Sequence, residues 1–325
     1  MNLSVPMQAE DKKLLASLQQ DFPLTEQPYK TLGEALGHCG AEVIAGLKKW
    51  QSEGVLRRIG GILNPGELGY STVLVAGAME PAGLETAAAL LGSLPQVTHN
   101  YLREGDFNLW FTLVYRDKAE LKSLLNKIRK NAKPRHLLTL PALKYYKLRA
   151  VFAWDEEPIA PRKPGPGKAR LKAETTQALL KLAGGSLPLV DRPFKVWGEE
   201  LGLSEPQVIS GLESLLSSGK LRRFGGILRH HLAGYAHNAM LALLVKEHQA
   251  DRAGNALAQR PEISHCYLRR KSPLWPYNLY AMLHAQSAGE LQRTLQKAVE
   301  LAQPLDYKIL KTLKEYKKIS WVKED

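Results

Sequence analysis

The chain has 325 residues, of which 44% are hydrophobic and 24% charged, a composition typical of globular proteins and long enough for two ordinary domains. Its first residues lack the apolar run of a signal peptide, and no later stretch is apolar enough to span a bilayer, so we expect no membrane association. The only cysteines, Cys39 and Cys266, are too few for a disulfide framework or a zinc site, which favours a reducing cytoplasm.

The formal net charge of +13 is concentrated in the second half of the chain. Residues 1–160 hold 19 Lys and Arg against 17 Asp and Glu, whereas residues 161–325 hold 26 against 15. Such a basic excess indicates an anionic partner, which can be a nucleic acid, an acidic membrane surface or a polyanionic small molecule. Charge by itself does not choose among these three.

The second half of the chain repeats the first at an offset of 165 residues, which grows by one and then by four more along the chain. The clearest repeats are VLRRIGGIL (55–63) with LRRFGGIL (221–228), VTHNYLR (97–103) with ISHCYLR (263–269), and NLWFTL (108–113) with NLYAML (278–283). The halves are joined by residues 155–172, which are rich in Pro, Gly and charge and are typical of a semi-rigid linker. Two homologous units therefore follow one another head to tail.

Each half opens with the pattern of a winged helix-turn-helix. In the first half, apolar residues recur at helical spacing in two groups: Leu14, Leu15 and Leu18, then Val43, Ile44, Leu47 and Trp50. In the second half, Ser204 has the chemistry of an N-cap and Pro206 falls in the first turn of the second helix. The RRIGGIL and RRFGGIL segments follow where a β-wing would lie. We therefore expect winged helix-turn-helix domains at 1–66 and 173–231.

The remainder of each half alternates strands and helices. In the first half we expect strands at 71–79, 97–103, 108–115 and 142–152, with helices at 83–94 and 118–130. The order βαββαβ predicts a ferredoxin-like domain with both helices on one face of an antiparallel sheet, at 67–154 and again at 232–325. The fold class is thus α+β, and two such sheets can pair as an internal pseudo-dimer.

The helix-turn-helix pattern raises the possibility of DNA binding, which the residues at the helix starts disfavour. The second helices begin with Glu42 in one half and with Glu205 and Gln207 in the other, without an early Arg or Lys. Carboxylates at the major groove would repel phosphates, whose neutralisation supplies most non-specific affinity. DNA binding is therefore the weaker alternative, and a winged helix that serves only as a scaffold is another.

A row of polar side chains repeats on the second strand of each ferredoxin-like domain. Alternate residues of a strand share a face, which groups Val97, His99, Tyr101 and Arg103, and in the second half Ile263, His265, Tyr267 and Arg269. We expect these rows on the face opposite the helices, lining a cleft. The adjoining strands place Trp110 in the first half, and Tyr280 and His284 in the second, toward the same face, so the two clefts differ.

These residue types suit an anionic, proton-accepting ligand. Histidine titrates near neutrality and can pass protons or ligate iron, tyrosine adds a donor, and arginine binds carboxylates bidentately. Four wing arginines, Arg57, Arg58, Arg222 and Arg223, are either solvated or bind carboxylates. The glycine pair beside them would let the backbone approach a flat ligand, or simply form a bulge. The sequence has no spaced metal-ligand cluster, so we expect no metal site.

The chain resembles the siroheme decarboxylase family, whose architecture is like that of Lrp/AsnC regulators. The residues that carry the resemblance are GVLRRIGGIL, THNYLREGDFNLWFTL and SHCYLRRKSPLWPYNLYAMLH, and it covers both halves. In that family the two units are often separate subunits of a heterodimer, which here are fused. The resemblance implies removal of two acetate carboxyl groups from siroheme to give 12,18-didecarboxysiroheme, in haem d₁ or alternative haem biosynthesis.

The resemblance also implies that no cofactor is needed beyond the iron that siroheme itself carries, and that histidines are essential. We expect His99 or His265 to act as general acid, or one of them to ligate the iron. We expect carboxylate and ring contacts from the wing arginines and from Tyr101, Arg103, Tyr267, Arg269, Trp110 and His284. The alternatives are a DNA-binding regulator of the Lrp/AsnC type and a tetrapyrrole carrier without turnover.

Overall fold

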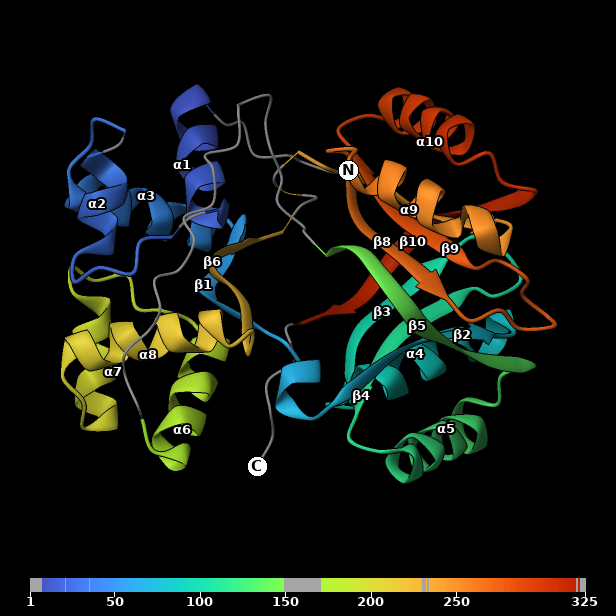
Figure 1. Ribbon diagram of the computed structural model, residues 1–325, viewed down its shortest axis with the longest axis horizontal. Helices are drawn as coiled ribbons and strands as arrows, with labels where there is room; N and C mark the ends of the chain where they lie inside the picture. The colour runs from blue at the N-terminus through green and yellow to red at the C-terminus, as the bar shows by residue number, and fades with distance from the viewer. Residues whose placement is uncertain are drawn as a thin grey trace. The chain divides into compact units, whose positions relative to one another are not determined.

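The computed structural model describes residues 8–20, 22–34, 36–148, 171–229, 232, 234–319 and 321. The expected linker at 155–172 lies outside the described residues except for its last two. The chain divides into two compact units, each built from both halves of the sequence (Figure 1). The helix-turn-helix unit comprises residues 1–68, 151–234 and 320–325, and the barrel unit comprises residues 69–150 and 235–319. Like domains thus associate with each other across the repeat.

The helix-turn-helix unit contains the two predicted helix-turn-helix motifs, each with three helices followed by one strand. The elements are α1 (Ala9–Gln20), α2 (Pro28–Glu34), α3 (Gly40–Ser52), β1 (Leu56–Leu63), α6 (Ala173–Gly184), α7 (Pro193–Leu201), α8 (Glu205–Ser217) and β6 (Leu221–Leu228). Ser204 is the N-cap of α8, as expected, and its backbone N–H donates to Oε1 of Gln207 in a capping box. The predicted helix-turn-helix is confirmed in both halves.

The repeated RRIGGIL and RRFGGIL segments are strands that pair with each other. β1 runs antiparallel to β6, with Gly60 opposite Gly225 at the centre of the register. Each strand was expected to form part of a wing in its own half, but its partner comes from the other half. The two copies of the phrase thus supply each other's backbone hydrogen-bonding partners.

The barrel unit confirms the βαββαβ order in both halves. Its elements are β2 (Ser71–Ala78), α4 (Leu84–Ser93), β3 (Val97–Arg103), β4 (Leu109–Tyr115), α5 (Lys118–Ala132), β5 (His136–Leu148), β7 (His237–Leu244), α9 (Ala250–Ala258), β8 (Ile263–Arg269), β9 (Leu279–Ala285), α10 (Ala288–Ala302) and β10 (Asp306–Lys318), with single 3₁₀ turns at Pro81–Gly83 and Glu247–Gln249. A further 3₁₀ turn, Gly66–Leu68, belongs to the helix-turn-helix unit.

The last strand of each half is long because it has two partners, and in the first half it begins earlier than expected. β5 starts at His136 instead of residue 142 and pairs with β2 as far as Pro141, then with β8 from Ala142 onward. Pro141 lies where the strand changes partners, a position that tolerates a residue without a backbone N–H. β10 is divided in the same way between β7 and β3. These long strands close eight strands into one barrel, which agrees with an internal pseudo-dimer.

Matching side-chain contacts hold the ends of the two long strands to the helices of the opposite half. Lys144 Nζ and Tyr146 Oη, on β5, donate to Oδ1 of Asp251 at 2.7 and 2.6 Å. On β10, Lys314 and Tyr316 donate in the same way to Glu85 of α4. The barrel is therefore joined across the repeat by strand pairing and by these paired ionic contacts.

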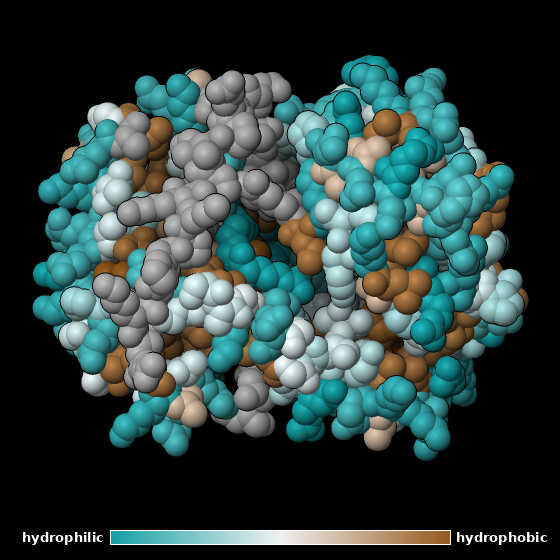
Figure 2. Space-filling model, in the orientation of Figure 1, coloured by the Kyte–Doolittle hydropathy of each residue, from teal (hydrophilic) through white to brown (hydrophobic). Residues whose placement is uncertain are grey.

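The barrel unit has three apolar clusters. Two lie between the sheets and their helices, α4 and α5 in the first half and α9 and α10 in the second. The third lies on the inner faces of the strands and includes Trp110, Trp275 and Tyr280. Hydrophilic side chains cover most of the face drawn in Figure 2, with smaller hydrophobic areas between them. No described helix is long and apolar enough to cross a membrane.

Candidate functional site

A β-bulge at the start of β3 and β8 sets the direction of the histidine rows. Val97 pairs with Leu113, but the next paired residue, His99, lies opposite Thr112, so Thr98 is the extra residue. Val97 therefore packs with the helix-side cluster, whereas His99 and Tyr101 follow the inner face. Val97 was expected to share a face with His99, and this is wrong because the bulge shifts the alternation. The second half repeats the bulge at Ser264.

The inner face carries the histidine rows as expected, and the eight strands close into a barrel around this face. Asn100, between His99 and Tyr101, donates through Nδ2 to the carbonyl of Ala88 on α4, which fixes that alternate position toward the helices. His99, Tyr101, His265 and Tyr267 are half-buried, and Arg103 is only 4% exposed. In the first row the accessible side chains are therefore His99 and Tyr101, whereas in the second row Arg269 is half-buried like His265 and Tyr267.

In both rows the arginine, tyrosine and histidine side chains lie next to one another, with the histidine and tyrosine rings stacked in the second half and tilted in the first. The guanidinium of Arg269 lies 4.6 Å from the ring centre of Tyr267, whose ring is stacked on that of His265 at 6.0 Å and 14°. In the first half the corresponding distances are 5.0 Å from Arg103 to Tyr101 and 6.2 Å from Tyr101 to His99. Cation–π contact and ring stacking thus hold each histidine at the end of an ordered row.

The second-half histidine belongs to a chain of three polar side chains. Oγ of Ser264 lies 2.8 Å from Nδ1 of His265 and 3.0 Å from Nε2 of His284, and it also approaches the carbonyl of Met282 at 3.3 Å. His284 is 7% exposed. A buried histidine, a hydroxyl and a half-buried histidine are thus connected within hydrogen-bonding distance.

The first-half histidine has a shorter connection. Oγ1 of Thr98 lies 2.9 Å from Nδ1 of His99, which repeats the serine contact. Val114 occupies the strand position that corresponds to His284, two residues after the partner of the histidine on β4. The predicted difference between the halves is therefore present in the structure, next to the histidines themselves.

The arginines of the two rows connect the halves of the barrel. Nη1 of Arg103 donates to the carbonyl of Leu310 and to Thr312, both on β10, and Nη1 of Arg269 donates to the carbonyl of Leu140 on β5. Burial lowers the pKa of Arg103 to about 10. Both guanidinium groups were expected to contact substrate, but in this structure they hold strand carbonyls.

The aromatic residues expected beside the site lie in the barrel interior. Trp110 is 1% exposed and donates from Nε1 to the carbonyl of Phe107, while Nε1 of Trp275 donates to Tyr280 Oη at 2.8 Å. The rings of Trp110 and Trp275 meet edge to face with centres 5.4 Å apart. This cluster lies in the barrel interior, where the guanidinium of Arg269 is 5.7 Å from the ring centre of Tyr280.

Two of the four wing arginines hold the ends of helices. Arg58 donates from Nη1 to the carbonyl of Gly185, the C-cap of α6, at 2.5 Å and from Nη2 to the carbonyl of Gly61. Its repeat partner Arg223 donates to the carbonyl of Gln19 in the last turn of α1. Helix C-termini leave carbonyls without intrahelical partners and favour cations. Burial and the neighbouring Arg57 lower the pKa of Arg58 to about 10.

The glycine pair allows the same helix ends to approach the strands. A Cβ at Gly60 would lie 2.5 Å from the carbonyl oxygen of Gly185, and one at Gly225 would lie 2.6 Å from that of Leu18. The close approach expected of a flat ligand is therefore made by protein backbone. The remaining wing arginine of the second half, Arg222, is exposed and donates to the Asn64 side chain at 3.0 Å. The wing arginines belong to the helix-turn-helix unit and the histidine rows to the barrel unit.

The polar residues at the starts of α3 and α8 serve the fold. Oε2 of Glu42 accepts from the backbone N–H of Cys39 in a capping box, which lowers the pKa of Glu42. Glu205 is only 6% exposed, and its side chain accepts a hydrogen bond from Nε of Arg192. These positions therefore offer no cation to a DNA groove.

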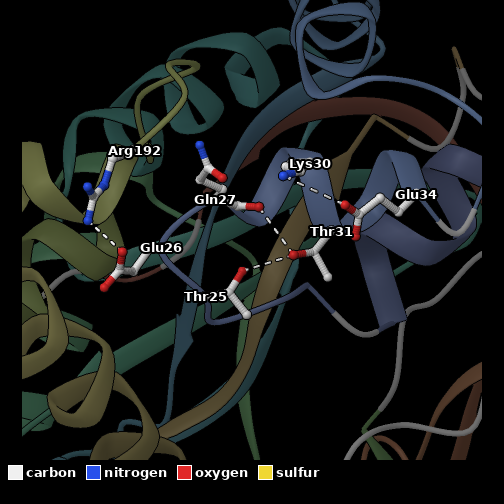
Figure 3. Close-up of a pocket in the computed structure, with 7 residues that line it drawn as sticks. All are labelled: Thr25, Glu26, Gln27, Lys30, Thr31, Glu34 and Arg192. Carbon is white, nitrogen blue, oxygen red and sulfur yellow. Dashed lines mark hydrogen bonds and ion pairs between the residues drawn. The ribbon is translucent and has the colours of Figure 1, made fainter.

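A polar hollow of about 450 Å³ in the helix-turn-helix unit lies beside this arginine (Figure 3). Its lining residues are Thr25, Glu26, Gln27, Lys30, Thr31, Glu34 and Arg192. Arg192 donates to Glu26 at 2.6 Å, and Lys30 and Glu34 form an i,i+4 ion pair. Cations and carboxylates thus pair with each other here, so the hollow lacks the excess positive charge that a polyanion requires. Within the described residues, no group of three or more His, Cys, Asp or Glu could hold a metal ion.

Sequence reasoning missed two sets of residues. Ser264 and Thr98 are hydroxyl residues directly before the repeated histidines, a signal visible in ISH and VTH. Asn278 and Asn108 each bind both backbone groups of one residue, Val245 and Met79 respectively. These asparagines hold the chain just beyond the end of the neighbouring strand.

Comparisons with known proteins match both halves of the chain. An AsnC-like ligand binding domain matches residues 67–147 and 232–317, and a siroheme decarboxylase NirDL-like HTH domain matches residues 11–57 and 176–222. The siroheme decarboxylase NirDL subunit of Paracoccus denitrificans is 36% identical over 293 residues, which are 89% of this chain and 88% of that protein. The similarity to this protein therefore extends over both copies of the repeat.

Separate subunits match the halves individually. The siroheme decarboxylase beta and alpha subunits of Desulfovibrio desulfuricans are 37% and 34% identical over 44% and 46% of this chain, and 91% and 87% of their own lengths. A crystal structure of the siroheme decarboxylase NirDL covers 97% of this chain and 95% of its own, with 28% identity and a TM-score of 0.71. The architecture and the sequence agree over nearly the whole length, and the chain belongs to the siroheme decarboxylase family.

Proposed function

We propose that this chain is a carboxy-lyase that removes two acetate carboxyl groups from siroheme to give 12,18-didecarboxysiroheme. The observation that carries the proposal is the similarity to siroheme decarboxylases over most of the chain, together with a histidine at the end of a His, Tyr and Arg row in each half. A related NirDL structure was determined in complex with an iron-uroporphyrin III analogue, which supports an iron tetrapyrrole as ligand. The basic excess of the second half suits a substrate with eight carboxylates.

In the proposed reaction, His99 and His265 are the candidate general acids. Loss of carbon dioxide from an acetate side chain leaves an electron pair on the methylene carbon, and a proton from histidine completes the new methyl group. Carboxylates that are retained need cationic partners, and Arg103 and Arg269 are the candidates that belong to the same unit as the histidines. Each already donates from Nη1 to a strand carbonyl, but a guanidinium has five N–H donors. No cofactor is proposed beyond the iron of the substrate.

Anaerobic incubation of the purified chain with siroheme, followed by mass analysis, tests the proposal. The expected product has lost two carboxyl groups as carbon dioxide, and activity is expected to persist after treatment with a chelator that does not extract the tetrapyrrole iron. Siroheme binding without a change of mass would identify a carrier and refute the enzyme. His99→Ala and His265→Ala, assayed singly, are both expected to reduce turnover, whereas full turnover in both variants would exclude the histidines as acids.

A further inference from the structure

The arginines of the two rows differ in how far the protein itself occupies their hydrogen-bond donors. We infer that Arg269, together with Tyr145 on the neighbouring strand β5, binds a carboxylate group of siroheme. Arg103 instead joins the two halves of the barrel. This assignment rests on the proposed function, and it adds Tyr145, which was not predicted from the sequence, to the candidate site. The row of the second half thus anchors the substrate.

The guanidinium of Arg103 is taken up by protein groups on both of its terminal nitrogens. Nη1 donates to the carbonyl of Leu310 at 3.1 Å and to Oγ1 of Thr312 at 2.9 Å, and Nη2 lies 3.7 Å from Sδ of Met282. The Thr312 hydroxyl donates in turn to Oδ1 of Asn238 at 2.6 Å. Because Arg103 is also only 4% exposed, it offers almost no surface to a ligand.

Arg269 has only one of its terminal nitrogens in use. Nη1 donates to the carbonyl of Leu140 at 2.9 Å, and no acceptor for Nη2 lies within the part of the chain that the structure describes. The guanidinium lies 4.6 Å from the ring centre of Tyr267 and 5.7 Å from that of Tyr280, contacts that hold it without using its N–H groups. Since the side chain is half-buried, the hydrogens of Nη2 remain for a carboxylate.

The strands that adjoin the two rows bring different residues to the tyrosines. β5 places Tyr145 opposite Tyr267, with the two rings edge to face and their centres 5.5 Å apart. At the equivalent position, β10 places Glu315 opposite Tyr101, and further along it brings Lys318 to the histidine, where β5 has a leucine. The first row thus adjoins a carboxylate and a cation of the protein. The second adjoins an aromatic ring, 48% exposed, that can cover part of a flat macrocycle.

The segments that follow the two rows also differ in charge. Arg270 and Lys271, both exposed, come directly after the second row. After the first row come Glu104 and Asp106, which are exposed as well. Lys311, whose carbonyl accepts from the backbone N–H of Glu104, supplies a positive charge there, but the two carboxylates outnumber it. A polyanionic substrate is therefore attracted to the end of the second row more strongly than to that of the first.

Anaerobic titration of the full chain with siroheme, followed by tetrapyrrole absorption, measures binding without requiring turnover. Arg269→Gln removes the cation, while Arg269→Lys keeps a positive charge without the planar group. Tyr145→Glu installs the residue of the first half, and Tyr145→Phe keeps the ring. Glu315→Tyr is the reciprocal change beside the first row and serves as the matched control.

We expect Arg269→Gln to weaken siroheme binding by about 10- to 100-fold, the range of a hydrogen bond to a charged group, and Arg269→Lys to weaken it less. Tyr145→Glu should weaken binding by at least about tenfold, because it places a second carboxylate beside the bound one, whereas Tyr145→Phe should retain most of the affinity. Glu315→Tyr should keep the Kd within about threefold of the wild type or lower it. Arg103→Gln should lower the Tm and cost less affinity than Arg269→Gln.

Two results would overturn the assignment of the ligand to the second row. One is an equal loss of affinity in Arg269→Gln and Arg103→Gln, and the other is wild-type affinity in Tyr145→Glu. Thermal unfolding checks that the variants are folded, and the exposed Tyr145 gives a test even if the arginine variants do not fold.

The same titration separates this assignment from the proposed function. Siroheme binding without decarboxylation by the wild-type chain would refute the enzyme, while the variants of Arg269 and Tyr145 would still support or overturn the binding site through their affinities. Failure of the wild-type chain to bind siroheme would refute both.

Discussion

Replacement of Arg58 by methionine separates a structural role of the wing arginines from a role in substrate binding. Arg58 makes a hydrogen bond of 2.5 Å to the carbonyl of Gly185 and one of 3.2 Å to that of Gly61. A hydrogen bond from a charged donor contributes about 1.5–3 kcal/mol, and removal leaves a helix C-terminal carbonyl without this donor. Desolvation of the guanidinium, which lowers its pKa to about 10, offsets part of this gain.

We therefore expect Arg58→Met to lower the free energy of unfolding by about 2 kcal/mol. For a unit of this size, about 2–4 °C of Tm accompanies each kcal/mol, so Tm should fall by roughly 4–8 °C. Arg223→Met, at the equivalent position, should behave in the same way. Arg222→Met removes the same charge from an exposed side chain and should change stability by less than about 0.5 kcal/mol.

Thermal unfolding and siroheme titration of these three variants test the reasoning together. The affinity of Arg58→Met for siroheme should stay within about twofold of the wild type, because its guanidinium hydrogens point to carbonyl groups. An unchanged Tm with a tenfold loss of siroheme affinity would refute the structural role and show that Arg58 binds a carboxylate.

Three further expectations concern the barrel unit and the cysteines. Asn278→Ala leaves both backbone groups of Val245 without these partners and should cost about 2–4 kcal/mol in urea unfolding; an unchanged midpoint would contradict this. Native alkylation at pH 8 should modify exposed Cys39 only, since burial raises the pKa of the Cys266 thiol to about 12, and a second mass increment before unfolding would contradict this. The pKa of Asp251 is lowered by hydrogen bonds from the lysine and tyrosine of β5, so its contribution is present above the unfolded pKa and lost as pH falls through the folded one; Asp251→Asn should therefore destabilise the protein at pH 7 but not in acid.

Several features of the site follow from local patterns in the sequence. The repeat is visible by comparison of the halves, and the βαββαβ order follows from hydrophobic periodicity, because the helix and strand periods expose different sets of residues to a core. The recurrence of His, Tyr and Arg at one spacing also identifies the row in each half. These are short-range properties, which a single sequence records directly.

A β-bulge makes the face of a strand residue hard to predict from sequence, because the extra residue shifts the alternation. The alternation rule places His99 and Val97 on the same face, but the bulge at Thr98 puts them on opposite faces. The residue type at position 98 does not indicate a bulge. The contact between Ser264, His265 and His284 likewise depends on this bulge and on the register of β8 with β9. Sequence analysis found two of these three residues but not the serine that joins them.

The sequence by itself was therefore enough to predict the duplicated α+β architecture and the family, and to find His99 and His265 as the repeated histidines of the two rows. What the tertiary structure decided was which groups the charged residues meet. Arg58 and Arg103 look alike as candidate carboxylate ligands in a sequence, but their partners are carbonyl groups 127 and 207 residues away along the chain. A guanidinium accepts any suitably placed oxygen as its partner, so its role is set by long-range packing that residue spacing does not encode.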